Sequence, residues 1–519
     1  MIRCVILSLI CGSYATKLPP THLDYDELNL HPLNVPNYKE YVEKYNEAEE
    51  NAQYWRDQAQ IQLERQLSRV FNTGVAKNVI LFIGDGMSIP TTTAARIHLG
   101  QRKGQTGEET QLSFDTFPYI GLSKTYCVDK QVADSACSAT AYLGGVKGNR
   151  HTIGVSAAVK VNDCVEMNKE INRVKSIAYY AQKQNKRTGF VTTTKVTHAS
   201  PAGVYGHTAN RMWEDDLYVK LAGKDSKVCH DLAQQLIYGE IGKNLNVIFG
   251  GGRKKFFPFY ETDEDHNHGD RFDSRNLIKE WNSIKNHTTH QYVRNREEFL
   301  NISNNVDYVL GLFDGSHMSY NLERDEKKQP SLSEMTQKAI DLLANGDEGY
   351  FLFVEGGRID MAHHKSEARK ALDETIELHK AVNIALNITS SNDTLIIVTA
   401  DHSHTMNING YPERGADVLG IGGWGIDFKR YTTISYANGP GYRKEVDGRY
   451  DPSKDNLTDI DYRYPSLVPL ISETHGGDDV AIYARGPWAH LFSGVVEQNF
   501  IHHAINFAAC IGPEKTTCN

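Results

Sequence analysis

The chain has 519 residues, of which 40% are hydrophobic and 23% are charged, and its formal net charge at neutral pH is −9. This composition is typical of a globular protein that can bury a large core, as one large domain or as several smaller ones. The acidic balance argues against nucleic acid or an acidic membrane surface as the main partner. It does not exclude an anionic substrate, because bound divalent cations can reverse the charge of a site.

Residues 1–15 are predicted to form a secretory signal peptide. Arg3 supplies a positive start, Val5 to Ile10 an apolar stretch, and Ser13-Tyr14-Ala15 a cleavage site with small residues. No other apolar run approaches the ~20 residues that cross a bilayer, and no apolar tail for a lipid anchor is found. We therefore expect a secreted protein. The alternative is a protein held at the cell surface by a lipid anchor, which would require that the native chain continues beyond residue 519.

Eight cysteines are present, and Cys4 and Cys11 lie in the signal, which leaves six. In an oxidising compartment these six are expected to pair as sequence neighbours. The expected pairs are Cys127 with Cys137, Cys164 with Cys229, and Cys510 with Cys518. Five glycosylation sequons agree with export, and they begin at Asn286, Asn301, Asn387, Asn392 and Asn456.

Strand-like apolar runs alternate with helical patterns along most of the chain. The runs are 79–83, 190–193, 247–249, 351–354, 395–398 and 480–483, and the helical patterns lie near 90–99, 136–146, 170–184, 331–345, 366–387 and 497–508. This alternation predicts an α/β protein with a central, mostly parallel sheet sandwiched by helices. Residues 16–70 are expected to form an N-terminal arm and helix. Residues 405–474, rich in Gly, Pro and Tyr, are expected to form an inserted subdomain.

Residue types that bind metals follow four of the predicted strands. The run at 79–83 leads to Asp85, and the run at 190–193 leads to His198 and Ser200. The run at 351–354 leads to Glu355, and the run at 395–398 leads to Asp401 and His402. Asp360 and His364 are four residues apart, so they share one face of a helical turn, and His475 precedes the last strand. Taken one at a time, these residues also have ordinary structural explanations: Asp85 could stabilise a turn, Asp401 could cap a helix, and His475 could be a loop residue without a ligand. Together they predict a metal centre, because ligands gather where strands of an α/β sheet end and carboxylates are rarely buried without a partner.

Ser135 is the candidate nucleophile. The small residues after Asp134-Ser135 permit a helix to start there, and a helix N-terminus favours a phosphoryl group. No Gly-x-Ser-x-Gly elbow surrounds Ser135, so it would depend on a metal rather than on a histidine base. The alternative is a serine that only caps its helix. Arg211 could bind phosphate with two parallel hydrogen bonds.

Six long motifs resemble the alkaline phosphatase family, in particular its animal secreted and membrane-anchored members. They span 78–87, 134–147, 198–211, 355–364, 399–404 and 474–486, within a similarity that runs from about Lys77 to Cys518. The resemblance implies a catalytic domain over 71–509 with a crown subdomain at 405–474, a disulfide-tied tail at 510–519, and a homodimer. Tyr411 resembles the residue that reaches into the partner subunit's site.

The resemblance also implies two zinc ions and one magnesium ion per subunit. Asp360, His364 and His475 would hold the first zinc, and Asp85, Asp401 and His402 the second, with Ser135 reaching it. Asp85, Ser200 and Glu355 would hold magnesium, with His198 behind them, and Arg211 would bind phosphate. The implied reaction is hydrolysis of phosphate monoesters at alkaline pH through a phosphoserine intermediate, releasing an alcohol and inorganic phosphate.

Three departures from the family pattern affect these expectations. Met361 stands where the family usually has a polar residue that helps to bind phosphate. Cys127 and Cys137 stand where vertebrate members commonly have other residues; we predict a bond between them, and free thiols are the alternative. Phe313-Asp314 matches part of a calcium site, but Gln329 replaces a carboxylate, so calcium stays open.

Three rival functions fit the sequence less well. A sulfatase needs Cys-x-Pro-x-Arg, and the segment that begins at Cys137 lacks both Pro and Arg. A related phosphodiesterase usually has a threonine nucleophile and no equivalent of Arg211. A catalytically inactive binding protein is expected to have lost a ligand or the nucleophile, and all are present. The physiological substrate is not predicted.

Overall fold

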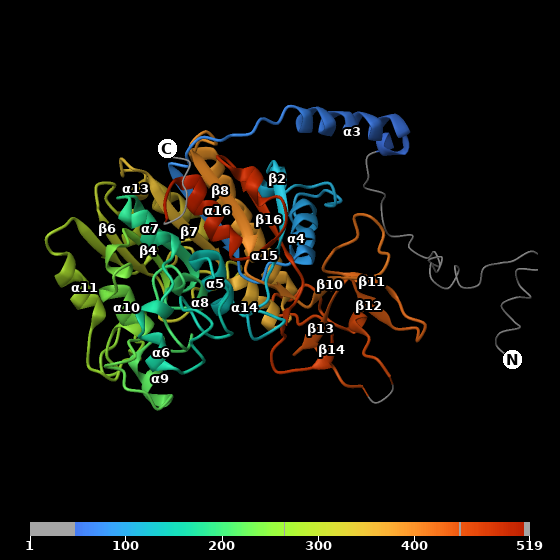
Figure 1. The fold of residues 1–519 in the computed structure, drawn as a ribbon. Helices are drawn as coiled ribbons and strands as arrows, with labels where there is room; N and C mark the ends of the chain where they lie inside the picture. Colours follow the sequence, from blue (N-terminus) through green and yellow to red (C-terminus); the bar gives the residue numbers. More distant parts are fainter. Residues whose placement is uncertain (1–46, 264, 446–447, 513–519) are drawn as a thin grey trace, which may run out of the picture. The chain divides into compact units, whose positions relative to one another are not determined.

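The computed structural model describes residues 47–263, 265–445 and 448–512 (Figure 1). Its main sheet contains β1 (Asn78–Gly84), β2 (Tyr119–Lys124), β3 (Arg187–Lys195), β4 (Val247–Gly251), β5 (His290–Val293), β6 (Tyr308–Leu312), β7 (Tyr350–Gly356), β8 (Thr394–Ala400), β16 (Val480–Arg485) and β17 (Gly494–Glu497). The order of the ten strands is β17-β2-β16-β8-β1-β7-β3-β4-β6-β5. The strands from β8 to β5 are all parallel, whereas β16 is antiparallel to both of its neighbours.

Helices cover both faces of this sheet. The α-helices of the described residues are α3 (Ala52–Leu67), α4 (Ile89–Gln101), α5 (Ser135–Gly144), α6 (Cys164–Met167), α7 (Ile177–Lys183), α8 (Ala199–Ala202), α9 (Asp216–Leu221), α10 (Leu232–Tyr238), α11 (Leu277–Lys285), α12 (Arg296–Leu300), α13 (Leu332–Leu343), α14 (Arg358–His364), α15 (Ala368–Ile388) and α16 (Phe500–Ala509). Alternate residues of a strand point to opposite faces. In β1, Ile80 and Phe82 therefore pack with α4, α13 and α15, while Val79 and Leu81 pack with α5, α7 and α16.

The predicted fold class is confirmed, because each of the six apolar runs forms a strand of the main sheet. One helical prediction was too long. The 170–184 pattern divides into a short 3-10 helix at Glu170–Asn172 and α7, because the side chain of Ser176 caps a new helix by accepting a hydrogen bond from the Tyr179 N–H. Helix α3 falls within the predicted N-terminal helical region and has no buried residue. The signal peptide lies outside the described residues.

Small sheets form between the main-sheet strands β8 and β16. One contains β10 (Met406–Ile408), β13 (Ile434–Gly439) and β14 (Ser466–Pro469), and the other contains β11 (Ile421–Trp424) and β12 (Arg430–Thr432), all drawn in orange in Figure 1. The segment begins and ends at two short strands, β9 (Ser403–His404) and β15 (His475–Gly476), which pair antiparallel. This pairing returns the chain to the carboxyl end of β8.

Two disulfides support the cysteine predictions. Cys127 is bonded to Cys137, and Cys164 is bonded to Cys229, so the free-thiol alternative for Cys127 and Cys137 was wrong. The third predicted bond involves Cys518, which lies outside the described residues. Within the described part of the chain, no helix is both long and apolar enough to span a membrane.

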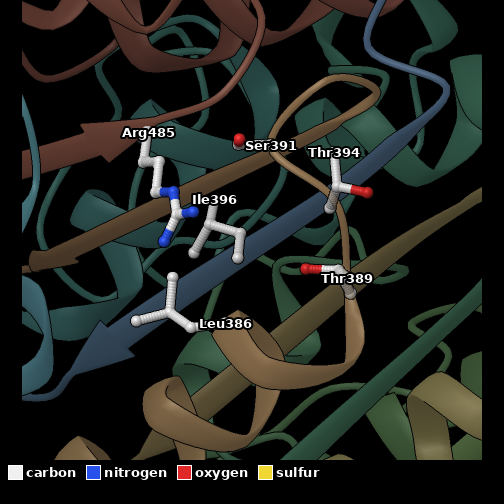
Figure 2. A pocket seen from close by; sticks show the side chains of 6 residues that line it. All are labelled: Leu386, Thr389, Ser391, Thr394, Ile396 and Arg485. Carbon is white, nitrogen blue, oxygen red and sulfur yellow. The ribbon is translucent and has the colours of Figure 1, made fainter.

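Figure 2 shows a small hollow at the end of the sheet where β8 begins. It is lined by Leu386, Thr389, Ser391, Thr394, Ile396 and Arg485. Because Thr394 starts β8 and Asp401 follows its last residue, the hollow and Asp401 lie at opposite ends of that strand. Asn387 and Asn392 lie near this hollow in the sequence, and all five sequon asparagines are exposed. Their glycosylation stays a prediction.

Candidate active site

The carboxyl ends of adjacent parallel strands bring the predicted ligands together. Gly84 at the end of β1 is in register with Gly356 of β7 and with Ala400 of β8. Asp85 and Asp401 therefore leave the sheet side by side. The backbone N–H of Gly86 donates a hydrogen bond to Asp401 Oδ1 at 2.8 Å, which fixes one carboxylate beside the other.

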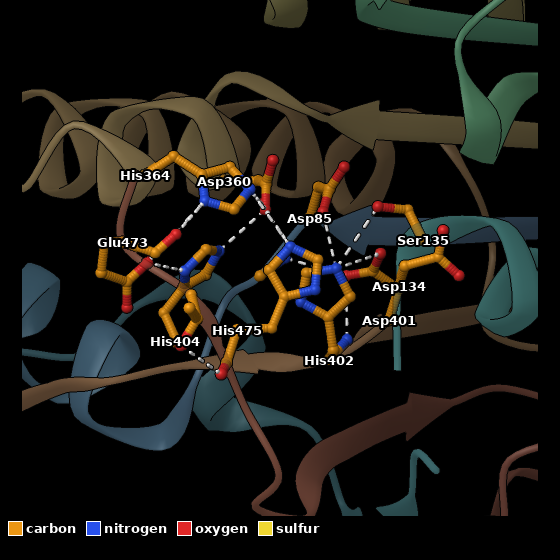
Figure 3. Close-up of polar contacts among 12 residues, drawn as sticks. Asp85, Asp134, Ser135, Asp360, His364, Asp401, His402, His404, Glu473 and His475 are labelled. Atoms are coloured by element: carbon orange, nitrogen blue, oxygen red, sulfur yellow. Dashed lines mark hydrogen bonds and ion pairs between the residues drawn. The ribbon is translucent and has the colours of Figure 1, made fainter. Parts of the chain in front are cut away.

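The first group of predicted ligands is Asp360, His364 and His475 (Figure 3). Helix α14 presents Asp360 and His364 from one face, with His364 Nε2 3.4 Å from Asp360 Oδ1. His475 Nε2 lies 3.3 Å from the same oxygen and 3.2 Å from His364 Nε2. Two imidazole nitrogens and one carboxylate oxygen that converge in this way match the three protein ligands of a catalytic zinc site.

The second group is Asp85, Asp401 and His402, and it is completely buried. His402 Nε2 lies 3.2 Å from Asp401 Oδ2 and 3.6 Å from Asp85 Oδ1. Ser135 is the first residue of α5, and its Oγ lies 3.3 Å from His402 Nε2. The candidate nucleophile therefore faces the second predicted metal site (Figure 3).

The third group is Asp85, Ser200 and Glu355. The hydroxyl of Thr194 donates to Glu355 Oε2 at 3.2 Å, and that of Thr192 also donates to it. Within the described residues, both Asp85 oxygens, Ser200 Oγ and Glu355 Oε1 are buried without a hydrogen-bond partner. Buried polar atoms are nearly always satisfied, so an oxygen set with free lone pairs fits a magnesium ion.

The protonation equilibria also indicate that positive charge is needed here. Burial, together with the charges of Asp401, Asp360 and Glu355, holds the pKa of Asp85 well above its ordinary value. Burial likewise raises the pKa of Asp401, and it raises that of Glu355 to about 7. Burying several carboxylates together is costly unless cations neutralise them. Bound divalent cations would return all of them to the charged form.

Arg211 lies between two side chains at the edge of the site. Its Nη1 donates to Asp134 Oδ2 at 2.9 Å, and its Nη2 lies 3.1 Å from His198 Nε2. Burial would lower the pKa of Arg211, but the charge of Asp134 raises it. Burial and the charge of Arg211 hold the pKa of His198 well below its ordinary value, so His198 can accept this hydrogen bond. A ring nitrogen of His198 also lies within 4.8 Å of Asp85 and Glu355.

Sequence reasoning assigned no role to two residues of the site, His404 and Glu473. His404 Nε2 lies 2.8 Å from Asp360 Oδ1, and His404 Nδ1 lies 2.6 Å from Glu473 Oε2. Burial opposes protonation of His404, but the charge of Glu473 and the hydrogen bond to Asp360 raise its pKa to about 10. The imidazole thus orients Asp360. The available signal was proximity, because each residue is two positions from a predicted ligand, His402 or His475.

The unusual Met361 contacts a charged side chain of its own helix, α14. Its Sδ lies 2.9 Å from Arg358 Nη1, and the Arg358 guanidinium lies 3.7 Å from the centroid of the Tyr320 ring. At the possible calcium position, Gln329 Nε2 donates to Asp314 Oδ2 at 2.7 Å, and Gln329 Oε1 accepts from the Ser319 N–H at 3.0 Å. These two bonds fix the amide with its donor toward the carboxylate. In this arrangement Gln329 does not offer its oxygen to a cation beside Asp314.

Helices on both faces of a mostly parallel sheet, with Asp and His groups beside a serine at a helix N-terminus, make this an α/β protein with a candidate metal centre. The family model for alkaline phosphatase matches residues 76–511. The chain belongs to the alkaline phosphatase family. It is a phosphatase, and its family membership supports hydrolysis of phosphate monoesters.

Curated relatives match along nearly the whole chain. The "membrane-bound alkaline phosphatase" of Bombyx mori is 48% identical over 482 residues, which cover 91% of this chain and 88% of that protein. The "alkaline phosphatase, tissue-nonspecific isozyme" of Homo sapiens is 45% identical, with 91% of each chain covered. Among solved structures, the alkaline phosphatase of Thermus thermophilus has a TM-score of 0.60 at 20% identity, covering 84% of this chain and 92% of that chain. That likeness supports the fold alone.

Proposed function

We propose that this phosphatase is metal-dependent and acts through a phosphoserine at Ser135. The observation that carries the proposal is the 3.3 Å distance between Ser135 Oγ and His402 Nε2. A ring nitrogen of His402 lies within 4.8 Å of carboxylate oxygens of Asp85 and Asp401 in one ligand group, and of ligand atoms of Asp360 and His475 in another. Ser135 lies at the N-terminus of α5, where free backbone N–H groups favour an attached phosphoryl group. Arg211 adds a charged, planar donor pair on the same side of the site.

The ligand groups support two zinc ions and one magnesium ion per subunit. Asp360, His364 and His475 would hold the first zinc, and Asp85, Asp401 and His402 the second. Asp85, Ser200 and Glu355 would hold magnesium. When bound, these ions would act as Lewis acids that lower the pKa values of the attacking hydroxyl and of water and stabilise the leaving oxygen.

The residues of the chain then perform two successive displacements. Ser135 Oγ attacks the phosphoryl group while Arg211 binds its non-bridging oxygens, and the alcohol leaves on the opposite side. Water next attacks the phosphoserine, and inorganic phosphate is released. Two inversions give net retention at phosphorus. Because both attacking groups must be deprotonated, we expect activity to rise toward alkaline pH.

Export and dimerisation also belong to the proposal. The disulfides Cys127–Cys137 and Cys164–Cys229 and the exposed sequons support an extracellular setting. Tyr411, which is 61% exposed in the segment between β10 and β11, is proposed to approach the site of a partner subunit in a homodimer. Residues 405–474 would be the crown subdomain around it.

The covalent step is tested with Ser135→Ala and p-nitrophenyl phosphate. We expect wild-type protein to hydrolyse the ester at alkaline pH and to show phosphate on Ser135 after acid quenching. The variant should lose the phosphoserine and nearly all turnover while keeping its bound metals. Unchanged turnover in Ser135→Ala would contradict the proposed mechanism.

A further inference from the structure

A short disulfide closes the loop directly before the nucleophile. Cys127 and Cys137 are ten residues apart, and their Cα atoms are separated by 5.9 Å. Both are 2% exposed and, with Ala133, they form a buried cluster that is separate from the two large cores of the sheet. The bond thus adds little to sheet packing. It ties the first turn of α5 to the chain that leaves β2.

Three consecutive residues inside this loop hold three different parts of the site. The carbonyl of Ala133 accepts a hydrogen bond from His475 Nδ1 at 2.8 Å, which leaves Nε2 of that ring free for a metal. The next residue, Asp134, binds Arg211 and also caps α5 by accepting from the Cys137 N–H. The third residue is Ser135. Figure 3 shows Asp134 and Ser135 together at one side of the site, with His475 between His364 and His402.

Few backbone–backbone hydrogen bonds hold the loop, although the carboxylates of Asp129 and Asp134 accept from the N–H groups of Arg150 and His151. The Cys127 N–H donates to the Lys130 carbonyl at 3.0 Å, and the Val128 N–H donates to the Gly148 carbonyl at 3.0 Å. Across the part of the chain that the structure describes, no backbone–backbone hydrogen bond involves residues 131–133. Residues 130–132 are exposed and lie in no helix or strand. Ala133 and Asp134 therefore make their hydrogen bonds to the site from an irregular segment, and the disulfide is the covalent link that fixes its two ends together.

We infer that the Cys127–Cys137 disulfide is a positioning element of the catalytic site, which holds Ala133, Asp134 and Ser135 in register with His475 and Arg211. The inference rests on the proposed function. A displacement of about 1 Å in a catalytic group can reduce turnover roughly 100-fold, so a small change in this loop is enough to matter. Opening the bond should affect three quantities at once, namely turnover, phosphate affinity and zinc affinity.

The test is the double substitution Cys127→Ser with Cys137→Ser, because serine is close to cysteine in shape and cannot form the bond. Thiol reductants are unsuitable, since thiols also bind zinc. Val309→Ala is the matched control. Val309 is a buried residue of β6, which is separated from β3 by β4, so this substitution destabilises the core away from the site.

The assays are run at a temperature well below the melting temperature of the double variant. We expect this variant to lower kcat at least ten-fold and to raise the inhibition constant of inorganic phosphate at least three-fold. It should also release zinc faster to a chromogenic chelator. The control should lower the melting temperature and leave all three quantities within two-fold of wild type. Equal values in the double variant and wild type would overturn the inference.

Two further outcomes are decisive. If Ser135→Ala abolishes turnover while the double serine variant behaves as wild type, the proposed function stands and the positioning role of the disulfide is wrong. If the serine pair fails to fold, Cys127→Ala with Cys137→Ala is measured in the same way. If neither pair folds while Val309→Ala does, the bond is a general folding determinant, and the local positioning role is overturned.

Discussion

His475 Nε2 lies 3.2 Å from His364 Nε2, and both nitrogens face Asp360 Oδ1. Two imidazole nitrogens this close to each other cannot both carry a proton, but both can donate a lone pair to one cation. His475 Nδ1 is bound to the Ala133 carbonyl and His364 Nδ1 to the Glu473 carbonyl. Nε2 of each ring is thus the nitrogen that points toward Asp360 and the predicted position of the first zinc.

Removal of metal should abolish activity reversibly. We expect dialysis against a chelator at neutral pH to reduce phosphomonoesterase turnover at least 1,000-fold, because Ser135 then has no group to lower its pKa. Zinc with magnesium should restore turnover, whereas magnesium alone should not. Full activity in protein that contains no measurable metal would contradict the proposal.

Replacement of Arg211 should separate binding from chemistry. Arg211→Ala is expected to lower kcat/KM for p-nitrophenyl phosphate by roughly 100-fold, the usual cost of losing one charged donor to a transition state. Phosphate should also become a weaker inhibitor. Arg211→Lys should recover only part of this, because an ammonium group cannot make two parallel hydrogen bonds. Recovery of wild-type values with lysine would argue against the two-pronged clamp.

His404 is expected to act through Asp360. In His404→Ala the Asp360 carboxylate loses its 2.8 Å contact, and loss of such an outer partner typically weakens metal affinity by about 10–100-fold. The measurement is a chelator titration with zinc content as its readout. High external zinc should restore most of the turnover. A variant with unchanged zinc affinity would show that His404 does not orient the ligand.

The pH dependence of stability should reflect Glu374, a buried residue of α15. Burial raises the pKa of Glu374 from 4.5 to about 8, although the Asn321 N–H donates to this carboxyl at 2.6 Å. The folded protein therefore keeps this proton to a higher pH than the unfolded chain does. Its stabilising contribution is complete below about pH 4.5 and is lost as the pH rises through about 8.

Glu374→Gln removes this titration, so we expect wild type to lose on the order of 3 kcal/mol more stability than the variant between pH 5 and pH 8. Urea unfolding of both proteins at the two pH values measures the difference. Glu297→Gln, at an exposed position of α12, is the control and should follow wild type. Parallel curves for wild type and Glu374→Gln would contradict the assignment.

The sequence was most informative where local pattern and topology agree. A buried parallel strand reads as a continuous apolar run, as in β1 and β7, and the carboxyl ends of such strands meet at one edge. Asp85, Glu355 and Asp401 could therefore be predicted to converge. The resemblance to a family then supplied their grouping into metal sites, which neither spacing nor composition specifies.

Other features depend on contacts that no local pattern encodes. The role of His404 arises because β9 pairs with β15, which places residues 404 and 475 opposite each other across about 70 positions of sequence. The Asp314–Gln329 bond depends on the path of a loop in the same way. The division of the 170–184 helix does follow from a local signal, since Ser176 is a favourable cap in the middle of that pattern.

The central claim is that buried Asp and His side chains hold a cluster of cations beside Ser135. Elemental analysis of purified, active protein tests it most directly. The account predicts two zinc ions and one magnesium ion per chain, with zinc falling to about one per chain in His475→Ala. Wild-type turnover in protein that contains less than one zinc per chain would contradict it.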